Sequence, residues 1–193
     1  MQKKIGLYFG SFNPIHIGHL IIAEQILTNS DLKEIWFVIS PHNPLKERHS
    51  LLNDHHRLAL VRVAIDDNPT FRACDIEFNL PKPSYTIHTL VNLESKYPNH
   101  QFCLIMGSDN LNVITKWFNY EQILDNYNIY VYPRPGFDGG EFVKHHSIIW
   151  VDAPLIEISS SYIRNSIASG KQVRYLLPPK VNEYIEEMHF YEK

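Results

Sequence analysis

The stretch that decides the fold is residues 8–20, "YFGSFNPIHIGHL". An apolar run over residues 5–9 ends at Gly10, and six residues later His16-Ile17-Gly18-His19 opens a segment with helical spacing. A strand that turns at a glycine into a helix is typical of the first unit of an α/β sheet. Ligands of such sheets bind outside the carboxyl ends of the strands. The stretch therefore predicts a fold and the position of a site.

The rest of the chain repeats this alternation. Apolar runs predict strands at residues 5–9, 35–40, 71–78, 102–107, 129–132 and 148–151. Apolar residues recur at helical spacing in the intervening segments 20–27, 58–65 and 85–93. The first four strands are mostly apolar rather than alternating, as expected of a sheet covered on both faces. The sequence predicts one α/β domain over residues 1–193, a doubly wound parallel sheet with a helical C-terminal tail.

Composition narrows the class of protein. The chain has 193 residues, of which 44% are hydrophobic and 20% charged, as is usual for a globular protein. Its net charge of -3 argues against general attraction to nucleic acid or anionic membranes. We expect no signal peptide and no membrane span, because the N-terminus runs directly into a strand and no apolar run reaches ~20 residues. Cys74 and Cys103 lie in strand-like runs and are predicted to be buried apolar residues, which favours the cytoplasm.

The opening stretch carries features of an anion site. Its helix would begin near His16, so that the free N–H groups and the positive dipole end face the predicted crevice. His16 and His19, at positions i and i+3, would share one face of the first turn. Gly18 would let a bulky anion approach the backbone. Two imidazole donors at such a site can stabilise charge that develops on a transferring phosphate.

Two other interpretations of the histidine pair remain open at this point. Histidines at a helix start are often only exposed polar residues, and an i,i+3 pair can also ligate zinc. The nearby histidines that might complete a zinc site fall in no convincing ligand pattern: His42, His49, His55 and His56. Neither a Walker A motif nor GxGxxG follows the first strand, which argues against a standard NTPase or NAD-binding loop.

Two motifs together resemble the signatures of the nucleotidyltransferase superfamily. The first is G-S-F-x-P-x-H-x-G-H at residues 10–19, and the second is I-S-S-[ST]-x-[IV]-R, here "ISSSYIR" at residues 158–164. The resemblance implies a Rossmann-like nucleotidyltransferase fold that transfers a nucleoside monophosphate from a triphosphate. The serines would cap a helix, and Arg164 would offer its guanidinium fork to phosphate oxygens. The residues that would bind the ATP phosphates are Gly10, Ser11, Phe12, Gly18, Ser159, Ser160 and Ser161.

Further segments are similar to those of the nicotinate-nucleotide adenylyltransferase family along nearly the whole chain. They are "SPHNPLK" from Ser40, "PSYTIHTL" from Pro83, "IMGSDNL" from Ile105, "KWFNYEQIL" from Lys116, "YPRPG" from Tyr132 and "YLLP" from Tyr175. Taken singly, each piece has a plainer interpretation, since Trp117 with Phe118 would serve as core aromatics and Asp109 as a helix cap. The chain departs from the usual family pattern at Asn13, where Asp is commoner, and at Ser161, where Thr is frequent.

The resemblance also implies roles for these segments. Lys46 would reach the phosphates, and Gly107, Asp109 and Arg134 would lie near the adenylyl or ribose portion. Trp117 would stack on the nicotinate ring, while the Thr86 hydroxyl and the amides of Ile87 and Phe118 would receive its carboxylate. The nicotinate pocket as a whole would consist of Ser84, Tyr85, Thr86, Ile87, Trp117 and Phe118.

The predicted reaction is the transfer of the adenylyl group of ATP to nicotinate mononucleotide, which yields nicotinate adenine dinucleotide and pyrophosphate for NAD biosynthesis. His16, His19 and Arg164 would be catalytic. Mg²⁺ would accompany ATP, held by phosphates and water rather than by protein side chains. The expected partners are these two small molecules, with no nucleic acid and no membrane, and a homo-oligomer is compatible with the sequence. Alternatives are a sister adenylyltransferase for nicotinamide mononucleotide or phosphopantetheine, a non-catalytic nucleotide-binding module, and a tRNA-binding synthetase fragment.

Overall fold

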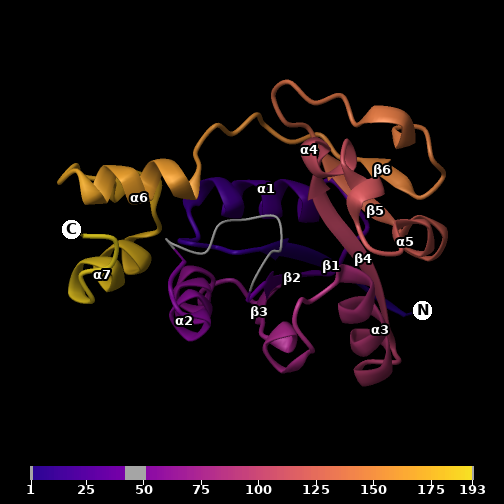
Figure 1. The fold of residues 1–193 in the computed structure, drawn as a ribbon, viewed down its shortest axis with the longest axis horizontal. Coiled ribbons are helices and arrows are strands. Elements are labelled where there is room, and N and C mark those ends of the chain that lie inside the picture. The colour runs from indigo at the N-terminus through magenta and orange to yellow at the C-terminus, as the bar shows by residue number, and fades with distance from the viewer. Residues whose placement is uncertain (1, 42–50, 193) are drawn as a thin grey trace.

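A parallel sheet organises the computed structural model, which describes residues 2–41 and 51–192 (Figure 1). In this part of the chain six strands pair in the order β3-β2-β1-β4-β5-β6, and every pair is parallel. The strands are β1 (Lys3–Gly10), β2 (Glu34–Ile39), β3 (Phe71–Cys74), β4 (His100–Gly107), β5 (Ile129–Tyr132) and β6 (Ile148–Trp150). Strand order reverses between β1 and β4, which makes their carboxyl ends the topological switch point. The predicted doubly wound sheet is confirmed.

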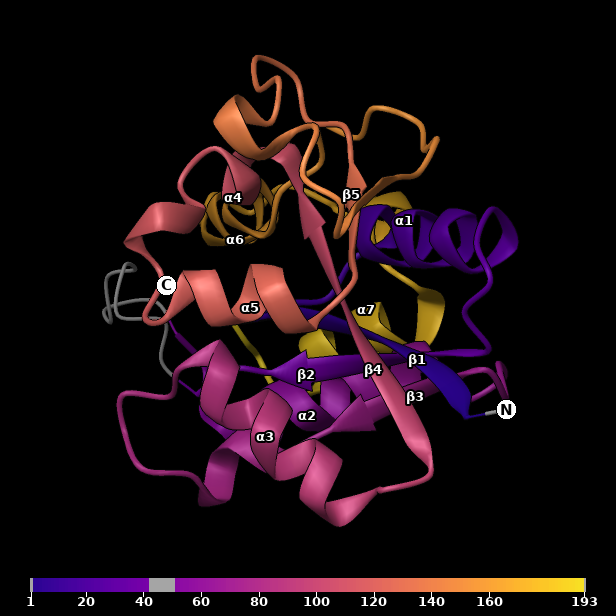
Figure 2. The same ribbon diagram turned by 90° about the vertical axis from the view of Figure 1, so that its right-hand side faces the viewer.

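Helices cover both faces of this sheet, as Figure 2 shows with α3 and α5 in front of the strands. The α-helices are α1 (Ile17–Thr28), α2 (Asp54–Ala64), α3 (Thr86–Lys96), α4 (Ser108–Leu111), α5 (Tyr120–Asn126), α6 (Ser160–Ala168) and α7 (Pro179–Glu187). Four short 3-10 helices are also described: η1 (Ile76–Asn79), η2 (Ile114–Lys116), η3 (Gly140–Phe142) and η4 (Arg174–Leu176). Helices α6 and α7 form the predicted helical C-terminal region, and α7 packs on α2 (Figure 1). None of the described helices has the length and apolar character of a membrane span.

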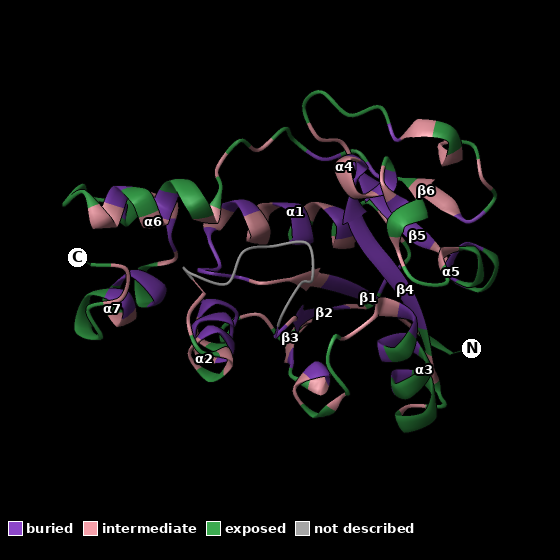
Figure 3. Cartoon of the chain, viewed as in Figure 1, coloured by how far each residue is buried: buried purple, intermediate pink, exposed green. Residues whose placement is uncertain are grey.

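Alternate residues of the strands supply two cores, one on each side of the sheet. Tyr8, Phe37 and Ile105 point toward α1, α2, α6 and α7, whereas Leu7 and Trp36 point toward α3, α4 and α5. Figure 3 shows the strands largely buried and the outward faces of the helices exposed. Burial on both faces accounts for the nearly continuous apolar strands of the sequence.

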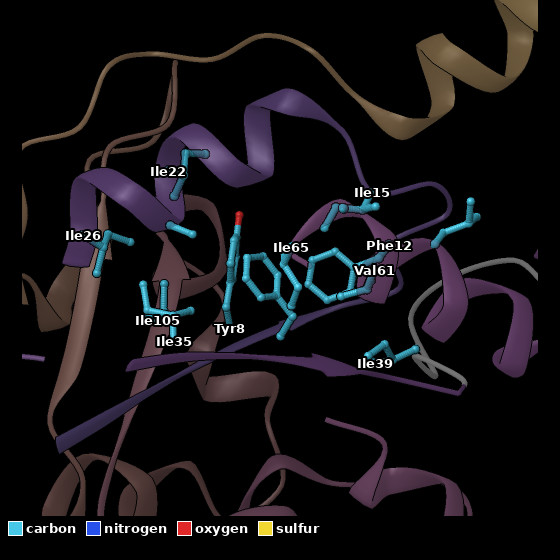
Figure 4. Close-up of a cluster of buried hydrophobic side chains, with 14 of the residues drawn as sticks. Tyr8, Phe12, Ile15, Ile22, Ile26, Ile35, Ile39, Val61, Ile65 and Ile105 are labelled. Atoms are coloured by element: carbon cyan, nitrogen blue, oxygen red, sulfur yellow. The ribbon is translucent and has the colours of Figure 1, made fainter. Parts of the chain in front are cut away.

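The core beneath α1 supports the predicted site. Ile22 and Ile26 of α1 pack down onto the sheet, next to Tyr8 and Ile105 (Figure 4). The ring of Phe12, from the loop between β1 and α1, lies in the same cluster. Helix α1 and its preceding loop are therefore fixed to the sheet by apolar packing, which holds the helix start at the switch point.

The third strand is shorter than its sequence predicts. A strand was expected over residues 71–78, but β3 ends at Cys74 and residues Ile76–Asn79 form η1 instead. The turn carries Glu77 inward, where its carboxylate accepts hydrogen bonds from Thr89 Oγ1 (2.7 Å) and Ser84 Oγ (3.1 Å). These partners come from a later segment, so the apolar pattern of residues 71–78 could not reveal the turn.

Both cysteines are buried and free, as predicted. Burial raises the pKa of the Cys103 thiol to about 11, and it also raises that of Cys74. Both thiols are therefore protonated at neutral pH and behave as small apolar residues of the core.

Candidate active site

A cavity of about 780 Å³ opens at the switch point, beyond the carboxyl ends of β1 and β4. Nearly all residues predicted for the site line it, although they come from segments far apart in the chain. They are Gly10, Ser11, Phe12, His16, Gly18, His19, Ser84, Tyr85, Thr86, Gly107, Asp109, Trp117, Phe118, Arg134, Ser159, Ser160, Ser161 and Arg164. Ile87 instead buries its side chain in the core beneath α3, and Lys46 lies outside the described residues.

The loop between β1 and α1 forms one wall of this cavity. Phe12 has a left-handed backbone (φ 44°), and its side chain is buried in the core. A Cβ at Gly10 would lie 2.8 Å from the end of the Phe12 ring, so the glycine makes room for that ring. The ring of Phe12 thus anchors the loop, and a contact between its backbone and phosphate stays a prediction.

The histidine pair lies at the start of α1, with His16 as the N-cap residue. The backbone N–H of His16 donates to Nδ1 of His19 (3.2 Å), which assigns the proton of a neutral His19 ring to Nε2. The two rings stack, with centroids 3.7 Å apart. The sequence prediction that both imidazoles share the first turn is confirmed, and their rings form one surface of the cavity wall.

His16 is a buried, neutral imidazole. It is 4% exposed, and its Nδ1 has no hydrogen-bond partner among the described residues. Burial, helped by the positive charge of Arg134, lowers the pKa of His16 from 6.5 to about 4. The His16 ring is therefore uncharged at neutral pH.

Gly18 is needed for packing at the start of α1. A Cβ at this position would lie 2.6 Å from Cγ2 of Ile156 and 3.0 Å from Nδ1 of His16. The segment before the second signature therefore approaches the helix start closely because residue 18 has no side chain. The approach of an anion to the same backbone stays a prediction.

The second signature is bonded directly to the loop of the first. Ser159 caps α6 by accepting from the Tyr162 amide (3.2 Å), as its sequence predicts. Ser160 Oγ donates to the carbonyl of Pro14 (2.9 Å), and Nη1 of Arg164 donates to the carbonyl of Asn13 (2.8 Å). Two segments about 150 residues apart in the chain are thus held together at one end of the cavity.

A charged pair lies at the carboxyl ends of β4 and β5. Nε of Arg134 is 3.8 Å from Oδ1 of Asp109, and each side chain is about one-third exposed. A Cβ at Gly107 would lie 2.3 Å from that carboxylate oxygen, so the glycine allows the pair to form. Ser108, which sequence reasoning missed, accepts from the Arg134 amide (2.9 Å) and fixes the turn. Because both side chains are partly exposed, the ion pair contributes little to the stability of the fold and mainly orients the two side chains.

Another part of the cavity wall is aromatic. The rings of Tyr85 and Phe118 face each other with centroids 4.7 Å apart, and Trp117 lies beside them. Helix α3 begins at Thr86, so the amides of Thr86 and Ile87 lack intrahelical partners. The predicted pyridine pocket therefore combines flat apolar faces with N–H and O–H donors.

Similarity to known proteins identifies the family of this chain. A family described as Cytidylyltransferase-like matches residues 7–166. The "Probable nicotinate-nucleotide adenylyltransferase" of Flavobacterium psychrophilum is 54% identical over 192 residues, covering 98% of this chain and 100% of the relative. The protein of the same name from Flavobacterium johnsoniae is 55% identical over the same shares of both chains. The chain belongs to the nicotinate-nucleotide adenylyltransferase family.

A solved structure shows the fold of the family independently. It is titled as a Plasmodium falciparum nicotinic acid mononucleotide adenylyltransferase complexed with NaAD. The TM-score is 0.81 at 23% identity, and the alignment covers 98% of this chain and 97% of the other. At this identity the likeness shows the fold, and it matches the Rossmann-like nucleotidyltransferase fold expected from the motifs.

This member of the adenylyltransferase family also places two buried tyrosines in the cavity wall. The hydroxyls of Tyr8 and Tyr132 lie 3.3 Å apart, at the carboxyl ends of β1 and β5. Burial raises the pKa of each hydroxyl, so both stay protonated at neutral pH. Their position at strand ends next to Gly10 and within "YPRPG" was a signal that sequence reasoning did not use.

Metal-ligating groups are sparse in the described part of the chain. It contains no group of three or more His, Cys, Asp or Glu side chains placed to hold a metal ion. Adenylyl transfer from ATP is consistent with a divalent metal, which such an enzyme can hold through the triphosphate. Within residues 2–41 and 51–192 the histidine pair is therefore not part of a zinc-ligand cluster, and His42 and His49, considered above as further ligands, lie outside the described residues.

Proposed function

We propose that this protein transfers the adenylyl group of ATP to nicotinate mononucleotide, with release of nicotinate adenine dinucleotide and pyrophosphate, as a step of NAD biosynthesis. One observation carries the proposal. The phosphate-directed groups of both signatures and the aromatic, donor-rich pocket line a single cavity. A triphosphate and a pyridine nucleotide can therefore meet there, and no covalent protein intermediate is required.

The chemistry is an in-line displacement at phosphorus. An oxygen of the 5′-phosphate of nicotinate mononucleotide attacks the α-phosphorus of ATP, and the bond to the pyrophosphate oxygen breaks. Reactions of this kind depend on positioning and on stabilising charge as it develops. In this proposal His16 and His19 donate hydrogen bonds to the phosphate oxygens that gain charge. His16 does so as a neutral ring, and in His19 the donor is Nε2, because Nδ1 accepts from the His16 amide.

The second signature holds the triphosphate tail. Arg164 donates to Asn13 and Ser161 through its two terminal nitrogens, which orients the guanidinium at the cavity wall. A guanidinium has further N–H donors, and these are directed at phosphate oxygens when ATP binds. The capped start of α6 adds its amides and the positive end of the helix dipole.

We propose that the divalent metal is Mg²⁺ and that it arrives with ATP. The fit rests on donor chemistry, because Mg²⁺ retains water and prefers phosphate oxygens over a dedicated protein cage. When bound, it neutralises charge on the leaving pyrophosphate. Asp109 lines the cavity and is paired with Arg134, which suits it to orienting groups around the nucleotide.

Acceptor choice follows from the pocket's donors. The Thr86 hydroxyl and the amides at the start of α3 present N–H and O–H groups to a ligand. A carboxylate accepts from all of them, whereas the N–H₂ of a carboxamide faces donors and is left unpaired, at about 1–3 kcal/mol. This favours nicotinate over nicotinamide mononucleotide. We further propose that residues 1–193 act as one domain and that the enzyme works in the cytoplasm.

Pyrophosphate release tests the function directly. The protein is incubated with ATP and Mg²⁺ and with nicotinate mononucleotide, nicotinamide mononucleotide or phosphopantetheine in separate reactions, and the dinucleotide is identified by mass. We expect turnover with nicotinate mononucleotide, loss of turnover with EDTA, and recovery with added Mg²⁺. Binding of ATP without turnover on any acceptor would instead support a non-catalytic nucleotide-binding module.

A further inference from the structure

The chain end returns to the phosphate side of the cavity. After α7, the backbone of His189 (φ 52°) and Tyr191 (φ 66°) is left-handed, which turns the last residues back toward α2. The ring of Phe190 packs on His56 of α2, with centroids 4.9 Å apart. Tyr191 is half-buried and packs against the core beneath α1. The tail is therefore held in a defined path.

Tyr191 ends this path on the loop of the first signature. Its hydroxyl donates to Oδ1 of Asn13 (2.8 Å), a residue 178 positions earlier in the chain. The amide of Leu52 donates to the same oxygen (3.2 Å). Asn13 is only 2% exposed, so its carboxamide oxygen is shielded from water and depends on such donors.

Asn13 is the centre of the loop that carries the histidines. Its backbone carbonyl accepts from Arg164, and the carbonyl of Ser11 accepts from the buried Arg57 (2.5 Å). His16, the N-cap residue of α1, follows three residues later. Asn13 therefore connects the Tyr191 hydroxyl to Arg164 and, three residues further on, to the N-cap histidine.

We propose that Tyr191 is a positioning residue for adenylyl transfer, acting through Asn13 on the loop that holds His16, His19 and Arg164. The inference rests on the proposed function. The C-terminal tail would then affect the residues on the phosphate side of the cavity and leave the nicotinate pocket unchanged. In this role the Asn13 side chain accepts the hydrogen bond from Tyr191, which requires an acceptor oxygen but no negative charge.

Two further observations support this role. A left-handed backbone is unfavourable for a bulky residue such as Tyr191, and such conformations persist where the surrounding structure demands them, often at functional sites. Burial raises the pKa of the Tyr191 hydroxyl, despite the nearby charges of Arg164 and Arg57, so the group remains a donor throughout the neutral range. The hydrogen bond from Tyr191 to Asn13 therefore does not depend on pH in the neutral range.

The test compares two Tyr→Phe variants in the same tail. Tyr191→Phe removes the hydroxyl and keeps the ring, and Tyr184→Phe is the matched control because Tyr184 packs on the neighbouring Phe190. We expect Tyr191→Phe to lower kcat about fivefold to tenfold, the loss that corresponds to one hydrogen bond of ~1 kcal/mol. KM for nicotinate mononucleotide should stay within about twofold, and Tyr184→Phe should keep wild-type kcat. A purely structural effect would lower the fraction of folded enzyme without lowering kcat per folded molecule.

A double-mutant cycle identifies the route. In an Asn13→Ala background, Tyr191→Phe should cause no additional loss of kcat, because the acceptor is already absent. Amide exchange of residues 11–19 in the unliganded chain should be about tenfold faster in Tyr191→Phe than in Tyr184→Phe. Unchanged kcat, or an equal loss in the Asn13→Ala background, would overturn the proposal. If the wild-type protein shows no turnover, the proposed function fails. Equal exchange rates in the two variants would show, independently of turnover, that the Tyr191 hydroxyl does not hold the loop.

Discussion

The protonation of His16 gives a sharp prediction about stability in acid. Its pKa is 6.5 in the unfolded chain and about 4 in the folded one, because folding buries the ring beside Arg134. Below pH 6.5 the His16 ring is therefore protonated in the unfolded chain but still neutral in the folded chain. The stabilising contribution of a neutral His16 is present above pH 6.5 and is lost progressively as the pH falls from 6.5 to about 4.

The magnitude follows from these two pKa values. At pH 5 the unfolded ring is almost fully protonated and the folded ring almost fully neutral, which lowers the free energy of unfolding by about 2 kcal/mol relative to pH 7. The limiting loss at lower pH is about 3 kcal/mol. His16→Asn removes the titrating ring and keeps a neutral polar side chain that suits a helix N-cap. The variant should therefore lose about 2 kcal/mol less than the wild type between pH 7 and pH 5.

Urea unfolding at several pH values measures this difference, and the control is His146→Asn, which removes a histidine that is exposed in the folded chain. The control should follow the wild type over the whole range. An NMR titration of the His16 ring protons supplies the folded pKa directly. Equal pH dependence of wild type and His16→Asn, or a His16 titration near pH 6.5, would refute the argument that burial keeps this imidazole neutral.

Three kinetic predictions follow from the site. His19→Ala should lower kcat by roughly 10²-fold with little change in KM for nicotinate mononucleotide, as measured by steady-state pyrophosphate release, since one transition-state donor is lost and the acceptor pocket is intact. Wild-type kcat in that variant would contradict the role of the ring. Trp117→Ala should raise KM for both pyridine mononucleotides. The wild type should prefer nicotinate over nicotinamide mononucleotide by at least ~10²-fold in kcat/KM, and Thr86→Val should reduce this preference. An unchanged ratio in Thr86→Val would exclude the Thr86 hydroxyl from recognition. Arg164→Lys keeps the charge but loses the bond geometry to Asn13, so kcat should fall at saturating ATP and added salt should not restore it, while full activity would show that charge alone suffices.

Local sequence was sufficient for the secondary structure around both signatures. The apolar run at residues 5–9 predicted β1, which begins two residues earlier and ends one residue later, and Gly10 and the residues that follow it predicted the start of α1 to within a residue. The serines before Arg164 likewise predicted a capped helix, and Ser159 is the cap. These features depend on groups a few residues apart, through strand burial, turn chemistry and helix capping, so the order of residues alone determines them.

Tertiary structure decided the contacts that make the site work. The sequence pattern of residues 71–78 did not reveal the turn at Glu77, since its partners Ser84 and Thr89 belong to a later segment. The neutral state of His16 depends on burial beneath other segments, which no local pattern measures. The bond from Tyr191 to Asn13 joins residues 178 positions apart and exists only because α7 packs on α2 and directs the chain end to the loop. Periodicity shows which face of an element is apolar, but burial, pKa and long-range hydrogen bonds depend on which elements meet, and that is settled only when the whole chain has folded.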